Sequence, residues 1–349
     1  MKIILAYSSK EGLLQEYRDR LGGYAPEEEI PADFFAEGDS RETIKAIINA
    51  LRSKGHNVIG MEASDLMHNT FNSFHPDLVF NIAEGLYGDF RESYIPMLCE
   101  KYNIPYTGSD PLTLAICLNK ARAKEILSYY LIPNPAFKVF YPLQEVYLQN
   151  FDFPAIVKPV SEGSSKGIFN DSIVDNVQVA RKKIEENIRR YNQPVILEKF
   201  LKGDEYTVGV WGNGDEMEVL PIVSINYSTL PEGAHPIYSY EAKWLWDTRD
   251  KPLEIFQCPA TLNPTLKERI EEVVKEAYQV LQIKDWCRID VRLDENGIPN
   301  ILELNPLPGV LPDPKENSCF PKAARTAGYS YAGMLNKVVE IAAKRYGLA

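Results

Sequence analysis

The sequence predicts an α/β protein with an open parallel sheet at its N-terminus and α+β segments after it. Two observations carry this prediction. Strand and helix signals alternate over residues 1–110, which is the pattern of an open, parallel α/β sheet. Residues 288–305 form two alternating runs around Asn296 and Gly297, the strongest short signal for a β-hairpin. With 349 residues, the chain is long enough for two or three domains.

The N-terminal part supplies the elements of the parallel sheet. Ile44, Ile47 and Leu51 repeat at helical spacing, and Asp39 with Glu42 predicts a capping box before them. Strands are expected at residues 3–6, 58–59, 78–80 and 104–106. Ligands of such sheets bind beyond the carboxyl ends of strands, where residues 81–85 fall. A plain polar turn is the alternative interpretation of that segment.

The rest of the chain mixes helices with further strands. Residues 111–131 predict one long helix that carries Lys120, and Pro133 with Pro135 ends it. Strands are expected at residues 155–159 and 195–198, and helices near 175–190, near 264–281 and at two places after the hairpin.

The predicted hairpin places acidic side chains opposite each other. With Asn296–Gly297 as a two-residue loop, Asp290 faces Glu303 and Arg288 faces Asn305 on one side. The other side would carry Ile289, Val291, Leu302 and Leu304. Two carboxylates that close repel unless a cation lies between them, and oxygen ligands suit Mg²⁺. The hairpin therefore indicates a magnesium site, the alternative being a solvated polar face.

A glycine- and serine-rich loop follows the strand at residues 155–159. It runs from Lys158 to Gly167 and reads Lys-Pro-Val-Ser-Glu-Gly-Ser-Ser-Lys-Gly. Its small residues let successive backbone N–H groups point into one concavity, which suits phosphate oxygens. Lys158 adds a positive charge where the strand ends. Taken alone, the loop is equally described as an ordinary turn.

Two further segments suit a nucleotide site. The apolar strand near residues 195–198 runs into acidic residues, and an extended segment leaving a sheet can offer backbone groups to an adenine and a carboxylate to a ribose. The polar stretch at 226–252 could close over a site and bring Lys243 to a phosphate. Solvated edge charges and a surface loop are the respective alternatives.

Together these segments supply phosphate binding, metal bridging and oxyanion stabilisation. The four histidines lie in no recognisable nucleophile motif. The set therefore suits phosphoryl transfer onto a bound carboxylate, where positioning and charge neutralisation do most of the catalysis.

Composition excludes several classes of protein. A net charge of −11 and a pI of about 5.1 disfavour nucleic acid or an anionic membrane as partner. The apolar runs are shorter than the roughly 18 residues of a membrane span, and the N-terminus lacks a signal-peptide pattern. The five cysteines include no Cys-x-x-Cys motif. These features predict a cytoplasmic protein without disulfides or zinc.

In order and spacing, these motifs resemble the ATP-grasp superfamily and, within it, the D-alanine–D-alanine ligases. The resemblance covers nearly the whole chain from about residue 76. The matching segments are residues 105–109, 120, 158–167, 198–199, 205–207, 240–243, 288–290, 303–305 and 308–309. The resemblance implies three domains, at residues 1–112, 113–205 and 206–349, with ATP between the central and C-terminal ones.

The resemblance also implies the cofactors and the residues of the site. The cofactors are ATP and two Mg²⁺ ions, for which Mn²⁺ can substitute. Residues expected to hold ATP are Lys120, Lys158, Glu162, Gly163, Ser164, Ser165, Glu198, Lys199, Phe200, Leu201, Glu205 and Lys243. The metal ligands would be Asp290, Glu303 and Asn305. The catalytic residues would be Arg288, Lys243, Gly309 and Ser164, and the substrate contacts Ser318, Glu84 and Trp244.

Three elements depart from the pattern of the D-alanine ligases: residues 6–12, residues 81–85 and Trp244. All three would shape the site of the first amino acid. The sequence therefore predicts an ATP-dependent ligase that joins amino acids or small peptides through an acyl phosphate, releasing ADP and phosphate. D-alanine–D-alanine ligase itself is the second prediction, and a nucleotide-binding regulatory protein without ligation is the third. No nucleic acid or membrane partner is expected, and a homodimer is left open.

Overall fold

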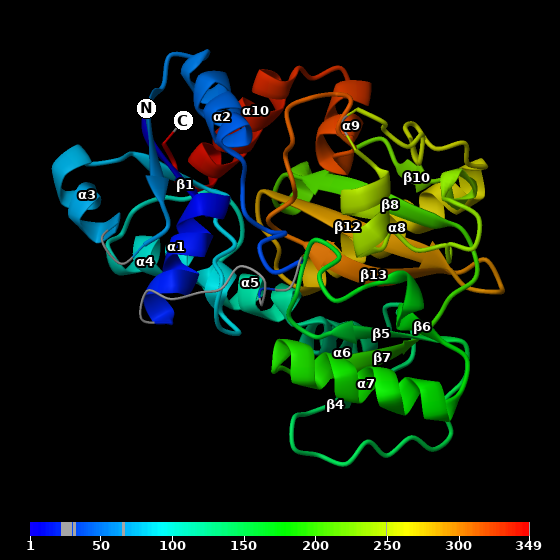
Figure 1. Ribbon diagram of the computed structural model, residues 1–349. Helices are drawn as coiled ribbons and strands as arrows, with labels where there is room; N and C mark the ends of the chain where they lie inside the picture. Colours follow the sequence, from blue (N-terminus) through cyan, green and yellow to red (C-terminus); the bar gives the residue numbers. More distant parts are fainter. Residues whose placement is uncertain (22–29, 31–32, 65–66, 249, 349) are drawn as a thin grey trace.

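The computed structural model describes residues 1–349 except 22–29, 31–32, 65–66, 249 and 349. Within the described residues, three β-sheets follow one another along the chain (Figure 1). The first is parallel, and the second and third are antiparallel and flanked by helices. The predicted fold class, a parallel sheet followed by two α+β parts, is confirmed.

The N-terminal sheet has the strand order β2–β1–β3, with β1 (Lys2–Tyr7), β2 (Asn57–Glu62) and β3 (Leu78–Asn81). All its pairs are parallel, as predicted. The expected fourth strand is reduced to a single bridge between Val79 and Tyr106. The helices here are α1 (Lys10–Arg20), α2 (Arg41–Arg52), α3 (Met67–Phe74), η2 (Arg91–Ser93) and α4 (Tyr94–Lys101).

Helix α2 begins one residue later than predicted. Its N-cap is Ser40, whose hydroxyl accepts a hydrogen bond from the N–H of Thr43 at 3.1 Å. The predicted capping box of Asp39 and Glu42 is therefore wrong, because Ser40 is the N-cap and the residue three positions after it is Thr43. As a result, Asp39 lies on the wall of the cavity described below.

The predicted long helix at 111–131 is two helices, α5 (Pro111–Leu118) and α6 (Lys120–Tyr129). The backbone of Asn119 is extended, with ψ of 94°, so α5 ends there. The Asn119 side chain then caps α6 by accepting from the N–H of Arg122 at 3.0 Å. This break places Lys120 in the first turn of α6, where its backbone N–H donates to the carbonyl of Val160.

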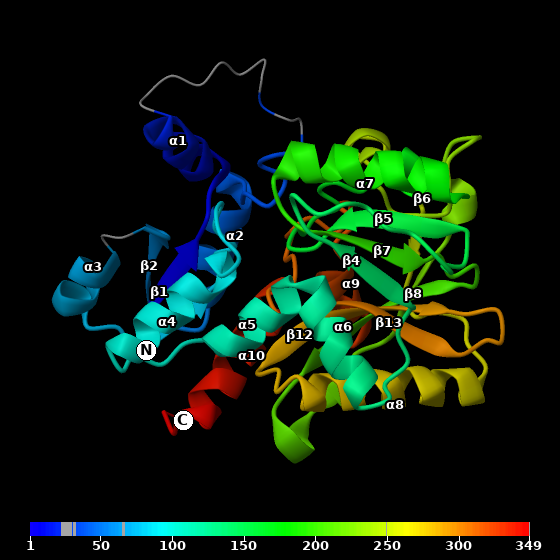
Figure 2. The same ribbon diagram turned by 90° about the horizontal axis from the view of Figure 1, so that it is seen from below.

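The central sheet has the order β4–β7–β5–β6, with β4 (Phe137–Phe140), β5 (Ala155–Pro159), β6 (Ile173–Val174) and β7 (Val195–Lys199). Its helices are η3 (Asn170–Ser172) and α7 (Val177–Tyr191). Ile184 of α7 packs against one face with Val157, while Ala121 of α6 packs against the other with Ile196. Figure 2 shows α7 and α6 on opposite sides of these strands.

The third sheet has the order β11–β10–β8–β12–β13, and β9 pairs with β8. Its strands are β8 (Glu205–Trp211), β9 (Glu218–Val219), β10 (Val223–Ile225), β11 (Phe256–Gln257), β12 (Trp286–Leu293) and β13 (Pro299–Asn305). The helices of this part are η4 (Gly214–Glu216), η5 (Tyr227–Thr229), η6 (Ala242–Trp246), α8 (Pro264–Val280), α9 (Cys319–Thr326) and α10 (Tyr331–Arg345). No helix among the described residues is long and apolar enough to cross a membrane.

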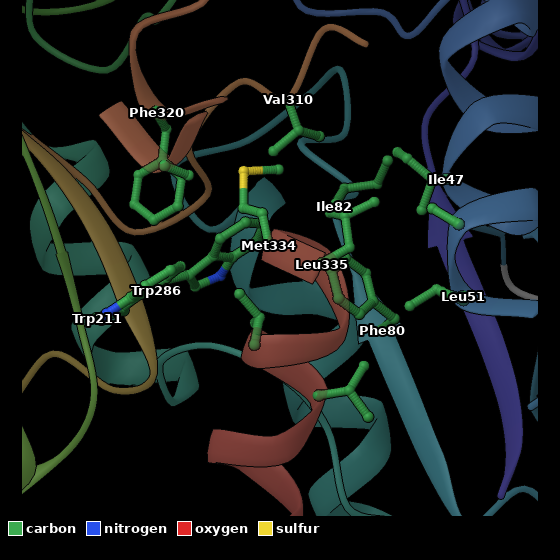
Figure 3. Close-up of a cluster of buried hydrophobic side chains, with 14 of the residues drawn as sticks. Ile47, Leu51, Phe80, Ile82, Trp211, Trp286, Val310, Phe320, Met334 and Leu335 are labelled. Atoms are coloured by element: carbon green, nitrogen blue, oxygen red, sulfur yellow. The ribbon is translucent and has the colours of Figure 1, made fainter. Parts of the chain in front are cut away.

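Helix α10 joins the third sheet to the N-terminal sheet. It lies beside α2 (Figure 1), and Asn336 donates to the carbonyl of Ala50 at 2.9 Å. Its Met334 packs in one buried cluster with residues of both parts (Figure 3). In that cluster the rings of Phe80 on β3 and Trp286 on β12 meet edge to face, with centroids 5.7 Å apart. This shared core fixes the N-terminal sheet against the third sheet.

The hairpin of β12 and β13 is confirmed, and its acidic end has the predicted register: Asp290 pairs with Glu303, and Arg288 pairs with Asn305. The turn is longer than predicted. Leu293 pairs with Pro299, and Gly297 has φ of +73°, which is typical of a three-residue loop with a glycine bulge.

A β-bulge beside Asp290 restores the register between the turn and the acidic end. Because two residues of β13 oppose one of β12 there, Leu302 turns to the cavity, and Ile301 joins the buried face in its place. The predicted placement of Leu302 with Ile289 is therefore wrong.

Candidate active site

A cavity of about 370 Å³ has walls from all three parts of the chain. A smaller recess of about 70 Å³ shares Glu84, Lys243, Arg288 and Glu303 with it. Every site residue that the sequence predicts lines one of the two: Lys120 and Asn305 line the recess, and the others line the cavity. The structure therefore brings the predicted residues together.

Lys158 is held by a buried carboxylate on the neighbouring strand. Its Nζ lies 2.7 Å from Glu198, and the Nζ of Lys124 lies 3.5 Å from the other oxygen of the same group. Burial by itself would raise the pKa of Glu198, but the two lysines hold that pKa below its ordinary value. Glu198 therefore stays charged and orients Lys158 along the cavity wall.

Lys124 was not predicted as a site residue. Its side chain is 2% exposed, and burial lowers its pKa to about 8 despite the attraction of Glu198. The only signal in the sequence is its position four residues after Lys120, one turn later on the same face of α6.

Lys120 connects the glycine- and serine-rich loop at residues 158–167, called the phosphate loop below, to the hairpin. Its Nζ lies 2.7 Å from Glu303 and donates to the backbone carbonyl of Glu162. Burial would raise the pKa of Glu303, but Lys120 lowers it to about 2. Glu303 is therefore ionised at neutral pH with a cation directly beside it.

Asp290 lies at the centre of the hairpin's polar face. It accepts from Arg288 at 3.2 Å and 3.0 Å, from the hydroxyl of Thr207 at 2.6 Å, and from Asn305 at 3.5 Å. Its pair with Arg288 also holds the guanidinium against the recess. The hairpin thus presents two carboxylates, one amide and one arginine to the same space.

The glycine- and serine-rich loop turns tightly at its tip. The N–H of Lys166 donates to the carbonyl of Gly163 at 2.9 Å, with Ser164 and Ser165 at φ of 50° and 62°. Two consecutive residues in this left-handed region make a type I′ turn, which non-glycine residues adopt at a cost in backbone strain. Such strain is concentrated at functional sites.

Carboxylates of the N-terminal part reach this loop. The N–H of Gly163 donates to Glu37 and the N–H of Gly167 to Asp33, both at 2.9 Å. Arg91 pairs with Glu37 at 2.6 Å and donates to the carbonyl of Ser161 at 2.8 Å. Two N–H groups of the loop that was predicted to bind phosphate therefore bind the protein's own carboxylates.

The segment 226–252 lies against the same loop, as its predicted role requires. The indole N–H of Trp244 donates to the carbonyl of Ser164 at 3.2 Å, and the Ser165 hydroxyl donates to the carbonyl of Tyr238 at 2.8 Å. Lys243, next to Trp244, lines the cavity. Burial and the nearby Arg288 lower the pKa of Lys243 to about 8.

The remaining predicted residues lie at the two ends of the cavity. Glu205 pairs with Arg292 at 2.8 Å, and that guanidinium lies 4.5 Å from the centre of the Phe200 ring. At the other end, the hydroxyl of Ser318 donates to the carbonyl of Gly309 at 2.9 Å. Arg292 is a second residue that the sequence interpretation missed.

Comparison with known proteins identifies the family. The family described as "D-ala D-ala ligase C-terminus" matches residues 134–340, more than half of the chain. A D-alanine–D-alanine ligase of Glaesserella parasuis is 32% identical over 326 residues, covering 92% of this chain and 96% of the relative. An uncharacterized protein, y4sG, of Sinorhizobium fredii is 29% identical over 309 residues, covering 86% and 87%.

Two solved structures have the same fold. One is a D-alanine–D-alanine ligase from Bacillus anthracis complexed with ATP, with a TM-score of 0.71, 22% identity and 99% of both chains covered. The other is the VanG D-Ala:D-Ser ligase from Enterococcus faecalis, with a TM-score of 0.68, 20% identity and 98% and 99% covered. The fold is therefore that of the ATP-grasp ligases. Within that class, the chain belongs to the D-alanine–D-alanine ligase family.

Proposed function

We propose that this protein is an ATP-dependent carboxylate–amine ligase that joins two amino acids, or an amino acid and a small peptide. The observation that carries the proposal is the grouping of Lys120, Lys243, Arg288 and Glu303 around one recess. Asp290 lines the adjoining cavity and pairs with Arg288. Cations there can neutralise transferring phosphoryl oxygens, and carboxylates can hold the counter-ions. The retention of this whole group argues against a regulatory protein without ligation.

ATP is proposed to lie between the central and third sheets, in the domain arrangement 1–112, 113–205 and 206–349. The adenine would contact the backbone of residues 199–201, and Glu205 would accept from the ribose. Lys120 and Lys158 would contact phosphates. The Bacillus anthracis ligase of the same fold is complexed with ATP, which supports ATP as the ligand. Glu198 lines the adenine end, where its bond to Lys158 gives it a positioning role.

Asp290, Glu303 and Asn305 fit a divalent cation. They are hard oxygen donors on one face of a hairpin, and the ammonium of Lys120 beside Glu303 marks a place where positive charge is stabilised. We propose that they hold two Mg²⁺ ions, which when bound would neutralise charge on the phosphate groups. Mn²⁺ has the same preference for oxygen ligands and can substitute.

The proposed reaction has two steps. A carboxylate oxygen of the first substrate attacks the γ-phosphorus, the bond to the β-phosphate breaks, and ADP leaves. The neutral amine of the second substrate then attacks the acyl carbon, loses a proton, and phosphate leaves. Lys243 would stabilise the transferring phosphoryl group. Arg288 and the N–H of Gly309 would stabilise the tetrahedral oxyanion, with Ser164 at the tip of the loop above them.

The two amino-acid sites are proposed at opposite sides of the recess. Ser318 would contact the carboxylate of the second substrate. Glu84 would face the first substrate, and Trp244 would cover it. The particular candidate that the relatives favour is D-alanine–D-alanine ligase, since one is 32% identical. Because the segment 81–85 and Trp244 differ from the pattern of those ligases, we expect D-alanine to be a poor first substrate.

The test is a screen of D- and L-amino-acid pairs with ATP and MgCl₂, following phosphate release and identifying products by mass spectrometry. ADP and phosphate should appear in step with the product. Arg288→Gln should lower kcat by about 10²–10³-fold, because it removes an oxyanion contact. The control is Arg269→Gln, at an exposed position of α8. Formation of AMP and pyrophosphate would contradict the mechanism. If D-alanine gives the highest kcat/KM of all amino acids tested, D-alanine–D-alanine ligase is favoured.

A further inference from the structure

Three carboxylates meet where the N-terminal part reaches the recess. Glu37 precedes α2, Glu84 follows β3, and Glu92 lies in η2. One oxygen of each lies within 4.8 Å of the others. Glu84 and Glu92 also line the recess, together with Lys243 and Arg288.

The three carboxylates differ in what they bind. Glu37 is satisfied by Arg91 at 2.6 Å and by the N–H of Gly163 at 2.9 Å. No hydrogen bond or ion pair joins Glu84 or Glu92 to any residue that the structure describes. Glu92 is nevertheless only 9% exposed. A buried carboxylate without a bonded partner is costly while it is charged, so Glu92 is suited to receive a cation.

The neighbouring cations are already engaged. Arg91, whose charge acts on both Glu84 and Glu92, is paired with Glu37 at 2.6 Å. Lys120, whose charge acts on Glu92, is paired with Glu303 at 2.7 Å. Burial raises the pKa of Glu92 to about 7, and burial with the nearby Glu37 raises the pKa of Glu84 well above its ordinary value. Both shifts agree with a site that lacks one positive charge.

The geometry selects the kind of cation. Two oxygens less than 4.8 Å apart can both accept from one nitrogen at about 2.8 Å, the usual length of a charge-assisted hydrogen bond. A primary ammonium group has three N–H donors and can bridge them. A divalent ion is less suited, because the third carboxylate, Glu37, is committed to Arg91.

The pair also lies beside the reacting groups. An oxygen of Glu84 is 3.9 Å from the place that a Cβ would take on Gly163, in the phosphate loop. The charge of Glu84 acts on Lys243, which opposes the lowering of that lysine's pKa by burial. A cation held here therefore lies next to the position of the carboxylate to be activated.

We propose that Glu84 and Glu92 together bind the primary ammonium group of the first substrate. This inference rests on the proposed ligase function and assigns a substrate-binding role to Glu92. The enzyme then requires a free primary amine beside the carboxylate that it activates. A 2-hydroxy acid brings no positive charge, and an N,N-dimethylated amino acid keeps a single N–H donor and cannot bridge the two carboxylates, so both are rejected.

The first test uses the wild-type protein. The amino acid with the highest rate at the first position in the screen is compared with its 2-hydroxy and N,N-dimethyl analogues, with the second substrate unchanged. We expect kcat/KM to fall by about 10⁴-fold for the hydroxy analogue, because a site built to bind N–H donors rejects a ligand without them. Equal use of the hydroxy acid overturns this inference and leaves the ligase function standing. If no amino acid gives ADP and phosphate, the proposed function fails, and this inference fails with it.

The second test separates binding from structure. Glu92→Gln should raise KM for that amino acid by about 10–100-fold while KM for ATP stays unchanged; Glu268→Gln, exposed on α8, is the control. Calorimetry of amino-acid binding at pH 7, in two buffers of different ionisation enthalpy, should show proton release by the wild type and less by Glu92→Gln. Unchanged KM and unchanged proton release overturn the proposal. Loss of bound Mn²⁺ from Glu92→Gln with an unchanged KM also overturns it, since Glu92 would then be a metal ligand.

Discussion

The ion pair between Lys120 and Glu303 gives the most quantitative prediction. The pKa of Glu303 falls from an ordinary 4.5 to about 2 in the folded protein. At 1.36 kcal/mol for each pKa unit, this corresponds to roughly 3 kcal/mol of stability. Because the folded pKa is the lower one, the contribution is complete above pH 4.5 and is lost as pH falls toward 2. Glu303→Gln should therefore lower the free energy of unfolding by about 3 kcal/mol at pH 7.

The assay is urea unfolding of the wild type and Glu303→Gln at pH 7 and pH 3. The difference in free energy should shrink to about 1.5 kcal/mol or less at pH 3, because the carboxyl is then protonated in the unfolded state and the pH is only about one unit above its folded pKa of about 2. The control is Glu295→Gln on the same hairpin, whose pair with Lys199 is exposed to solvent and should change the free energy of unfolding far less. Equal stability of Glu303→Gln and wild type at pH 7, or a difference that does not change with pH, would refute the reasoning.

Two further predictions concern the phosphate loop. Trp244→Phe removes the 3.2 Å bond to the carbonyl of Ser164, so limited proteolysis within 226–252 should become faster, and Mg-ATP should protect the wild type more than the variant. Identical digestion rates would show that this contact does not hold the segment. Gly167→Ala should destabilise by about 3 kcal/mol or more, because φ is +76° and the new Cβ would lie 2.3 Å from Pro159. Gly55→Ala, with φ of +80° and no atom within 4 Å, should cost about 1 kcal/mol in the same denaturation experiment.

The pairing of the hairpin was predictable because strand periodicity is local. A period of two places Asp290 and Glu303 on one face whenever Asn296 and Gly297 form the turn. The three-residue loop and the bulge at Leu302 shift the register twice, and the two shifts cancel at the acidic end. The sequence thus determined which residues meet at the proposed metal-binding face, and the three-dimensional fold decided where the bulge falls.

Order and spacing along the chain also determined the fold class and most of the cavity residues. The loop after β5, the end of β7 and the hairpin each belong to a strand that is recognisable in the sequence. Contacts between distant segments had no such signal. Glu37 and Gly163 are 126 residues apart, and their bond depends on how the N-terminal sheet packs against the third sheet through α10. Lys124 is distinguished from a surface lysine only by its burial beside Glu198. Charge pairing and burial of this kind depend on the positions of whole elements, and no local period in the sequence encodes them.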